Sequence, residues 1–558
     1  MSTLGLSMSP LLIVTVFLPL LGSLALFVMP SWSYRTARVV ALAFSLATLA
    51  LSLLLLAGFD KDSGQQFLTS QPWLSFGQAS IHFALGLDGI SIWLFVLSTV
   101  LVVPAIFSSW ESIRERAPAH YGLILALETG LLGLFAAQDV ILFYVFFEFT
   151  LIPLFFLIGL YGGPQRNKAA ITFFLYTLAG SLLTLLGVIS LVITYQRHSP
   201  AHILTFNIPE LTKGLANLNW TEWKAPHTWS EWRHRAFWTS PQIMIFMLLF
   251  AGFAIKVPLF PFHTWLPLAH VEAPTAGSIL LAGVLLKVGG YGFLRFNMAM
   301  VPLGAEALYP MLATLAVISI LYGALAALAQ TDVKRLVAYS SVSHMGFIAL
   351  GIFAGTRTST DGAVAQMVNH GITTGALFAC VGIFYERYHT REMSEIGGLW
   401  QRLPLLAFFL ILASLGSAAV PGLNGFVGEF PILAGTFARS PGFAITAAIG
   451  MVLGAYYLLL MLQRVIFGPL HEPGEHGHAE PIRPIGRHEI AGLAPLMVLI
   501  VLIGVYPKPL FDRISPAVAA IVRDKPTIPS GSAPNFARPD TATDRPGRLA
   551  TLSQDRAR

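Results

Sequence analysis

The chain has 558 residues, of which 55% are hydrophobic and only 11% are charged. Soluble domains carry about 25% charged residues, so this composition, with a mean hydropathy of +0.69, excludes an ordinary globular protein. The net charge of +6 resides in loops and the tail, which favours membrane topology over nucleic-acid binding. A single cysteine, Cys380, excludes an internal disulfide framework and Cys-rich cluster ligation. No GxGxxG or GxxxxGK[ST] pattern supports nucleotide binding.

Apolar runs long enough to cross a bilayer follow one another along the chain. They predict an all-α polytopic membrane protein with about fourteen transmembrane helices. The first run lacks the charged flank and cleavage site of a signal peptide, so we expect it to be retained as a helix. The expected spans are 10–30, 38–58, 85–107, 120–137, 139–161, 169–195, 242–265, 276–297, 308–329, 334–354, 361–387, 403–438, 442–466 and 488–506.

Lysine and arginine are distributed unevenly between the short loops on the two sides of these runs. With the N-terminus outside, the short outside loops carry only Lys61, Arg357 and Arg439. By the positive-inside rule, this asymmetry predicts that both termini lie outside. The short inside loops then carry Arg35, Arg38, Arg114, Arg116, Arg166, Lys168, Lys334, Arg335, Arg387, Arg391, Arg402, Arg464, Arg483 and Arg487.

Two of the runs contain residues that interrupt helices, the seventh at KVPLFPF and the twelfth at VPGLNGFVGEFP. The two breaks lie five spans apart, which predicts two five-helix repeats inserted in opposite directions, as in transporters with discontinuous helices. The expected organisation is three N-terminal helices over 1–110, a first repeat over 120–297 with a long loop at 196–241, a second repeat over 308–466, a last helix over 488–506, and a disordered tail over 515–558.

Ionisable residues recur at similar depth inside successive runs, where each is energetically costly. Taken alone, a membrane histidine often bonds a neighbouring helix, and one Glu with one Lys can form a structural ion pair. Their recurrence beside two broken helices favours function and predicts a polar belt in the membrane plane. The candidate residues are Glu148, Lys256, Lys287, His344, His370 and Glu429, with Glu128 and His263 as secondary candidates.

The chemistry of these groups points to protons. Low dielectric lowers the pKa of an amine and a nearby carboxylate raises it again, so joining or separating such a pair switches proton affinity. Our hypothesis is that Glu148 pairs with Lys256 and that protons pass along Lys287. His344 and His370 would then act as relays, and Glu429 would be the terminal exchange group, completing the candidate set.

Long motifs around these residues are similar to those of a known family. They are FYVFFEFTLIPLF, KVPLFPFHTWLPLAHVEAPTAGSILLAGVLLKVGGYG, QTDVKRLVAYSSVSHMGF, VNHGITTGALF and NGFVGEFPIL. From about residue 85 to 470 the chain resembles the antiporter-like subunits of NADH:quinone oxidoreductase, respiratory complex I. Glu429, where the L and N subunits typically carry lysine, and the short tail without a lateral helix resemble the M (chain 4) type.

The resemblance implies that Glu148 and Lys256 are the key pair, Lys287 the connecting lysine and Glu429 the residue near the exit. It implies a multi-pass protein of the bacterial inner membrane with both termini periplasmic, beside the antiporter-like subunits L and N. The chain carries no haem, flavin or iron–sulfur signature, so we expect no cofactor in it. NADH, FMN, iron–sulfur clusters and quinone are expected on partner subunits.

The alternative function is a subunit of a Mrp-type sodium/proton antiporter. An enzyme with its own quinone pocket is a third hypothesis, and the absence of a redox centre and the burial of charges in paired helices argue against it. Leu268 stands where many bacterial relatives have an acid.

Tryptophans in the loop 196–241 indicate an interfacial loop or a contact with an accessory subunit. A group that superficially resembles a metal site lacks fixed ligand spacing and is expected to be a solvated loop; it consists of His471, Glu472, Glu475, His476 and His478.

Overall fold

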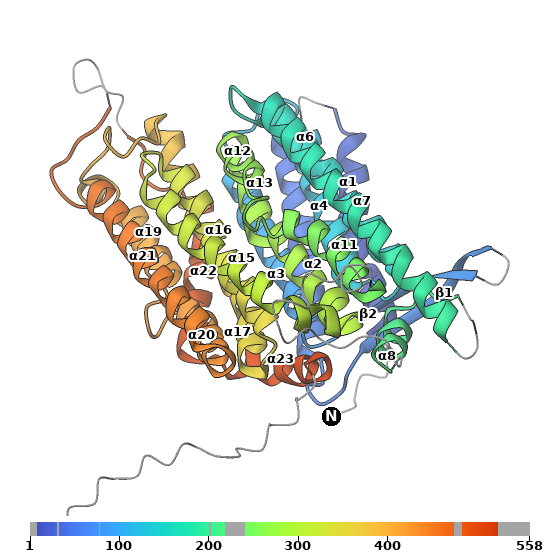
Figure 1. Ribbon diagram of the computed structural model, residues 1–558. Helices are drawn as coiled ribbons and strands as arrows, with labels where there is room; N and C mark the ends of the chain where they lie inside the picture. The colour runs from blue at the N-terminus through green and yellow to red at the C-terminus, as the bar shows by residue number, and fades with distance from the viewer. Residues whose placement is uncertain are drawn as a thin grey trace, which may run out of the picture. The chain divides into compact units, whose positions relative to one another are not determined.

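The computed structural model describes residues 8–30, 33–76, 79–199, 202, 204–217, 240–473 and 482–522, and these are built almost wholly of helices (Figure 1). The first half contains α1 (Met8–Phe27), α2 (Tyr34–Ala57), β1 (Gln66–Phe76), β2 (Ala79–Leu87), α3 (Ser91–Ser108), α4 (Ala117–Ala136), α5 (Val140–Phe149), α6 (Leu151–Tyr161), α7 (Arg166–His198), α8 (Ile208–Asn217), α11 (Pro241–Lys256), α12 (Trp265–Glu272), α13 (Thr275–Leu280), η1 (Leu281–Leu285), α14 (Leu286–Gly292) and η2 (Phe293–Met298).

The second half also consists mainly of long helices joined by short connections. It contains α15 (Pro302–Leu328), α16 (Val333–Ala354), α17 (Arg357–Tyr388), α18 (Leu399–Arg402), α19 (Pro404–Ser417), α20 (Asn424–Arg439), α21 (Pro441–Val465), α22 (Arg487–Val505) and α23 (Lys508–Ile521).

Among the described residues, 12 helices are long and apolar enough to cross a membrane. Two shorter apolar helices, α11 and α19, begin the two spans that the sequence predicts to be broken, and α12 and α20 complete them. The all-α polytopic class is confirmed, and the count of fourteen crossings stays a prediction, as do the inverted repeats.

Four spans form the centre of the helical assembly: α4, the continuous run from α13 to η2, α16 and α17. Their most apolar windows are between 94% and 100% buried, whereas those of α1, α2, α21 and α22 are at most 39% buried. Helices that are apolar on every side are stable only when protein surrounds them or lipid does. The central helices therefore hold their polar residues away from both water and lipid.

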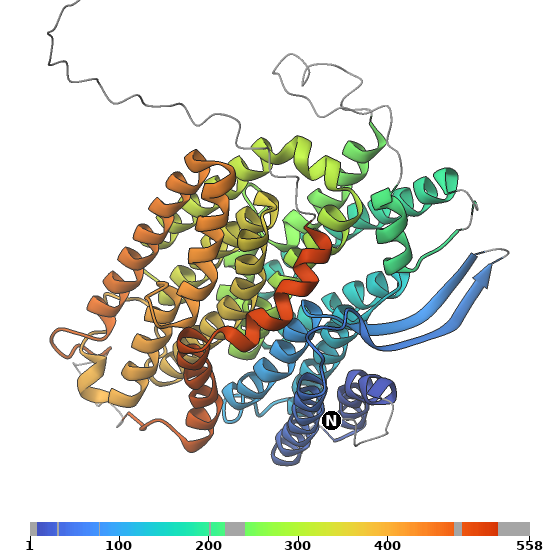
Figure 2. The same ribbon diagram turned by 90° about the horizontal axis from the view of Figure 1, so that it is seen from below.

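The hairpin β1–β2 is absent from the sequence prediction. Its strands pair antiparallel, with Gln71 opposite Phe83, and it projects sideways beyond the helices (Figure 2). The predicted start of the third span at 85 is wrong, because Leu85 and Leu87 belong to β2 and α3 begins only at Ser91. Both leucines are fully buried, so their apolar character comes from packing in the strand.

The predicted boundary of the tail at 515 is also wrong, because α23 continues to Ile521. Leu510, Ile514 and Val518 recur every four residues and are all buried, which gives the helix one apolar face to pack on the protein. Figure 2 shows α23 lying across the lower face. Residues 523–558, to which the rest of the predicted tail belongs, lie outside the described residues.

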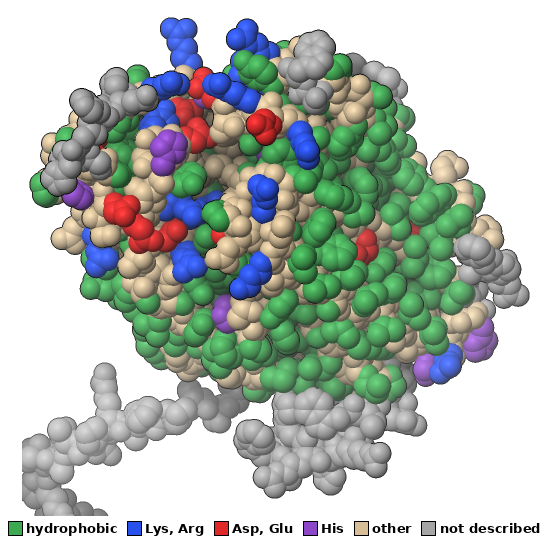
Figure 3. Space-filling view, turned by 90° about the horizontal axis from the view of Figure 1, so that it is seen from above, with side chains coloured by type: hydrophobic (Ala, Val, Ile, Leu, Met, Phe, Trp, Pro, Cys, Tyr) green, Lys and Arg blue, Asp and Glu red, His purple; other side chains and the backbone are tan. Residues whose placement is uncertain are grey.

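The opposite end of the molecule carries α12 and the start of α7 (Figure 1). Lys and Arg side chains gather on this face, among acidic and histidine side chains, and hydrophobic surface surrounds them (Figure 3). It is the end that the loop charges predict to be inside.

The break between α19 and α20 depends on a close backbone approach at Gly425. A Cβ atom at this position would lie 2.0 Å from the carbonyl oxygen of Gly416. Only glycine allows the chain to turn back this closely after α19.

We expect Gly425→Ala to destabilise the protein by about 1–3 kcal/mol, because the methyl group forces α19 and α20 apart. The measurement is the thermal unfolding midpoint of the detergent-purified protein. Gly442→Ala is the matched control, since a Cβ atom there meets nothing within 4 Å. An unchanged midpoint for Gly425→Ala would contradict the packing described here.

Candidate functional site

Lys256 is the last residue of α11, directly before the non-helical segment that leads into α12. The break frees backbone groups that need partners in a membrane. Trp265 Nε1 donates to the carbonyl oxygen of Ile255 at 3.0 Å, and the Phe260 amide donates to Ser319 Oγ at 2.8 Å. These two bonds, one within the break and one from α15, stabilise the irregular segment beside Lys256.

The Lys256 side chain is only 2% exposed and is enclosed by aromatic rings. Its Nζ lies 5.0 Å from the centroid of Phe147 and 5.9 Å from that of Phe173. Within the described chain, Nζ has no hydrogen-bond partner. The ammonium is therefore held by ring faces, an interaction that leaves its protons uncommitted.

Glu148, the expected partner, lies near the end of α5. This helix stops at Phe149 because Pro153 cannot donate to the Phe149 carbonyl. Glu148 lies within electrostatic range of Lys256. No direct hydrogen bond or ion pair between the two appears among the described residues, and the pair itself stays a prediction.

Lys287 lies at the centre of a fully buried span, between the two π-helical turns η1 and η2. Its Nζ donates to the carbonyl oxygen of Ala282, five residues earlier, and to Nδ1 of His370 at 2.7 Å. The wider turn of a π-helix brings a carbonyl within reach of the ammonium, and such turns are frequent at functional sites. Lys287 is thus 0% exposed yet hydrogen-bonded.

Beyond His370, the predicted residues of the second half lie in contact. The rings of His370 and His344 have centroids 5.4 Å apart. Nδ1 of His344 lies 2.6 Å from Oε1 of Glu429, which also accepts from Nε2 of Gln366 at 2.9 Å. Lys287, His370, His344 and Glu429 therefore form one buried row, supplied by α14, α17, α16 and α20.

The secondary candidates lie outside this row. Glu128 in α4 is 0% exposed, and neither carboxylate oxygen has a hydrogen-bond partner within the described chain. His263 lies in the break after α11, where its ring stacks on Phe260 and meets Tyr322 edge-on at 4.9 Å. The structure buries both side chains without joining them to the row.

Sequence reasoning missed His270, on the short helix α12. Its side chain is 0% exposed and stacks on Phe378 at 4.6 Å, and neither ring nitrogen has a partner in the described part of the chain. It lies within electrostatic range of Lys287 and Lys334. The signal was present, because His270 belongs to the long motif around Lys256, but it does not lie near the centre of an apolar run.

The sequence predicts Lys334 to be a residue of the inside loops, whereas the structure places it inside a helix. It lies in the first turn of α16, is 8% exposed and donates to the carbonyl oxygen of Ala273 at 2.7 Å. Arg391 donates to the neighbouring carbonyl of Val271 at 2.9 Å. Both cations thus stabilise the carboxyl end of α12, which carries partial negative charge.

Two other predicted features fall partly or wholly on residues that the structure leaves out. Glu475, His476 and His478 of the possible metal site lie outside the described residues, and no group of three metal-ligating side chains occurs within them. Glu472 contacts Arg402 and Tyr388. The loop tryptophans also lie outside the described residues, namely Trp220, Trp223, Trp229, Trp232 and Trp238.

Comparison with known proteins decides the family. The family model described as NADH:quinone oxidoreductase/Mrp antiporter, TM matches residues 137–454, more than half of the chain. The NADH-quinone oxidoreductase subunit M of Rhodobacter capsulatus is 41% identical over 525 residues, covering 93% of this chain and 97% of that protein. The chain belongs to the subunit M family. The resemblance predicted from the motifs is confirmed.

A further relative and two solved structures extend the comparison. NADH-ubiquinone oxidoreductase chain 4 of Arabidopsis thaliana is 39% identical, over 91% of this chain and 96% of that protein. A chain of respiratory complex I from Thermus thermophilus superimposes with a TM-score of 0.77 at 32% identity, covering 92% of this chain and 99% of that chain. A chain of the Mrp complex from Dietzia sp. has the same TM-score at 20% identity, covering 93% and 98%, which shows a shared fold.

The bond between Phe260 and Ser319 can be tested directly. We expect Ser319→Ala to cost about 1–3 kcal/mol of stability, because it leaves a backbone amide unpaired in the break beside Lys256. The measurement is again the thermal unfolding midpoint, which Ser319→Thr should largely restore.

The control for this substitution is Ser190→Ala in α7, whose hydroxyl bonds only the carbonyl of Leu186 in its own helix. Equal midpoints for Ser319→Ala and Ser190→Ala would show that the bond contributes nothing.

Proposed function

We propose that this chain is a proton-translocating membrane subunit of a redox-driven NADH:quinone oxidoreductase. Its support is the buried row Lys287, His370, His344 and Glu429, in which neighbouring titratable groups lie within hydrogen-bond or ring-contact distance. Consecutive titratable groups inside a membrane protein are typical of a proton relay. Membership of the subunit M family supports the redox-driven complex as its setting.

In the proposed relay, Lys287 gives a proton to Nδ1 of His370, along the hydrogen bond that already joins them. The proton leaves His370 at Nε2, toward His344. The ring centroids are 5.4 Å apart, so this step needs a bridging water or a ring rotation. Nδ1 of His344 then passes the proton to Glu429, whose second donor, Gln366, keeps the carboxylate oriented in the meantime.

Lys256 and Glu148 are the proposed loading pair of the first half. Because no hydrogen bond commits the Lys256 ammonium within the described chain, a small movement toward or away from Glu148 changes its electrostatic environment. Gly289 lies two residues after Lys287 in α14 and packs against Val257, the residue that follows Lys256. This contact couples the two lysine-bearing segments. Glu128 and His263 stay secondary candidates for the same transfer.

The remaining parts of the proposal concern the surroundings of the subunit. NADH, FMN, iron–sulfur clusters and quinone would be bound by partner subunits, so the translocase reaction is shared and this chain contributes the proton step. Its neighbours would be the antiporter-like subunits L and N in a bacterial inner membrane. Both termini would then lie on the periplasmic side, in agreement with the loop charges.

Lys256→Ala is expected to abolish proton pumping while membrane insertion stays intact, because the substitution removes the group that loads the proton. The measurement is acidification of membrane vesicles on addition of NADH, with assembly of the complex checked in the same preparation. Lys168→Ala is the control, since Lys168 is exposed at the start of α7. Normal pumping by assembled Lys256→Ala would refute the proposed role.

The Mrp-type antiporter is the alternative function, and the shared fold of the Dietzia complex is the observation that favours it. Purification of this chain from its native membrane, with identification of companion subunits by mass, separates the two. We expect companions that carry NADH and iron–sulfur sites. Small antiporter subunits in their place would support the alternative.

A further inference from the structure

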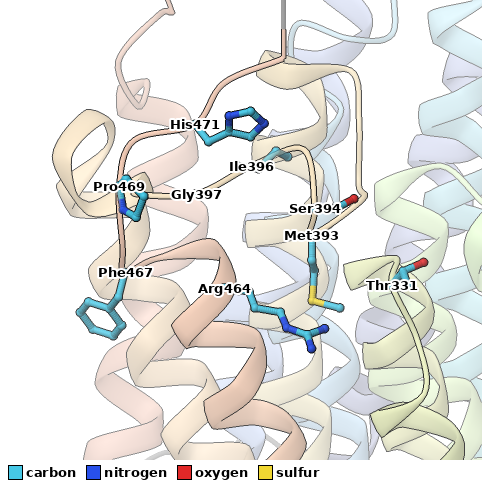
Figure 4. Close-up of a pocket in the computed structure, with 9 residues that line it drawn as sticks. All are labelled: Thr331, Met393, Ser394, Ile396, Gly397, Arg464, Phe467, Pro469 and His471. Carbon is cyan, nitrogen blue, oxygen red and sulfur yellow. The ribbon is translucent and has the colours of Figure 1, made fainter.

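A cavity of about 380 Å³ lies at the end of the molecule opposite α23, remote from the buried row. Three connections enclose it: the turn between α15 and α16, the loop between α17 and α18, and the end of α21 with the residues that follow (Figure 4). The residues that line it include the apolar Met393, Ile396 and Phe467 and the hydroxyl-bearing Thr331 and Ser394.

The strongly basic residue that lines this cavity is Arg464. Arg464 lies in the last turn of α21, and Figure 4 shows its side chain extending toward Met393, while Phe467 points away from it. Within the described chain, no hydrogen bond or ion pair is recorded for the Arg464 guanidinium. Some other arginines are paired: Arg387 binds Glu489 at 2.7 Å, and Arg439 binds Glu306 at 2.8 Å.

Within the described residues, the lining of the cavity brings no negative charge to Arg464. None of the side chains that line it is acidic. Two acids next to it in sequence have other partners: Glu395 accepts from Thr390, and Glu472 lies 3.4 Å from Arg402 and accepts from Tyr388. An exposed guanidinium over a hollow without carboxylates attracts an anion.

The position of the cavity identifies the kind of anion. It lies where the apolar outer face of α21 ends, and that face exposes Ile449 by 51%, Val452 by 70% and Leu459 by 52%. Phe467 and Trp400, exposed by 52% and 48%, flank the same end. Exposed aromatic side chains at the end of a lipid-facing helix are typical of the membrane–water interface. The cavity is therefore at headgroup level, directly beside the acyl-chain region.

We propose that this cavity binds the headgroup phosphate of an anionic phospholipid. The Arg464 guanidinium donates two parallel hydrogen bonds to the phosphate oxygens, and the hydroxyls of Thr331 and Ser394 donate to the remaining oxygens. The acyl chains extend along the exposed apolar face of α21. Free phosphate satisfies only the polar half of this site, whereas a phospholipid also covers the apolar walls. The site is independent of the proton relay.

The test uses the purified complex in detergent and a photoactivatable phosphatidylglycerol, with crosslinked peptides mapped by mass spectrometry. We expect crosslinks to residues 393–397 and 464–471 that unlabelled phosphatidylglycerol displaces. Arg464→Gln should lower the apparent affinity at these peptides about tenfold, because a charge-assisted pair is lost. Arg464→Lys, which keeps the charge without the bidentate geometry, should lower it less.

Arg166→Gln is the matched control, because it removes an exposed arginine from the same end of the molecule, in the first turn of α7. Its crosslinks should equal those of the unchanged protein, and NADH oxidation should be equal in all variants, which reports intact assembly. Unchanged affinity in Arg464→Gln would overturn the proposal. So would equal displacement by phosphatidylcholine or by inorganic phosphate at the same concentration.

Discussion

The hydrogen bond between Lys287 Nζ and His370 Nδ1 joins the two halves of the chain, and the surrounding architecture depends on it. An ammonium enclosed in apolar protein is tolerated only when donors and acceptors are matched around it. The π-helical turns on either side of Lys287 provide that match, since they bring the Ala282 carbonyl to the amine. The irregular turns of this span and its complete burial therefore go together, because a buried ammonium needs hydrogen-bond acceptors close by.

At both helix breaks, the freed backbone groups also need hydrogen-bond partners. In the first, Trp265 and Ser319 satisfy the freed carbonyl and amide. In the second, Asn369 donates to the carbonyl oxygen of Asn424 at 2.7 Å and Asn424 donates back to that of Asn369 at 3.3 Å. The titratable groups beside the breaks differ, however. The Glu429 carboxylate is held by two donors, whereas aromatic rings surround Lys256.

Cations at the inside end bind groups within the protein. Composition alone would attribute these cations to membrane topology. Lys334 and Arg391 bind carbonyls at the end of α12, and Arg387 binds Glu489. Each of these cations therefore has hydrogen-bond partners within the protein. Arg464 has no such partner in the described chain and lines a cavity at this end, which suits it to meet an anion of the bilayer.

The sequence by itself determined the helical membrane class, the positions of both breaks and the residues Lys287, His344, His370 and Glu429, because charges and prolines inside apolar runs are costly and therefore conspicuous. Only the tertiary structure decided which of these residues touch. Contacts such as His344 with Glu429 join positions 85 residues apart, and no periodicity reports such distances. The π-turns, the hairpin and the burial of His270 and Lys334 were decided in the same way, since packing between helices, rather than local preference, selects them.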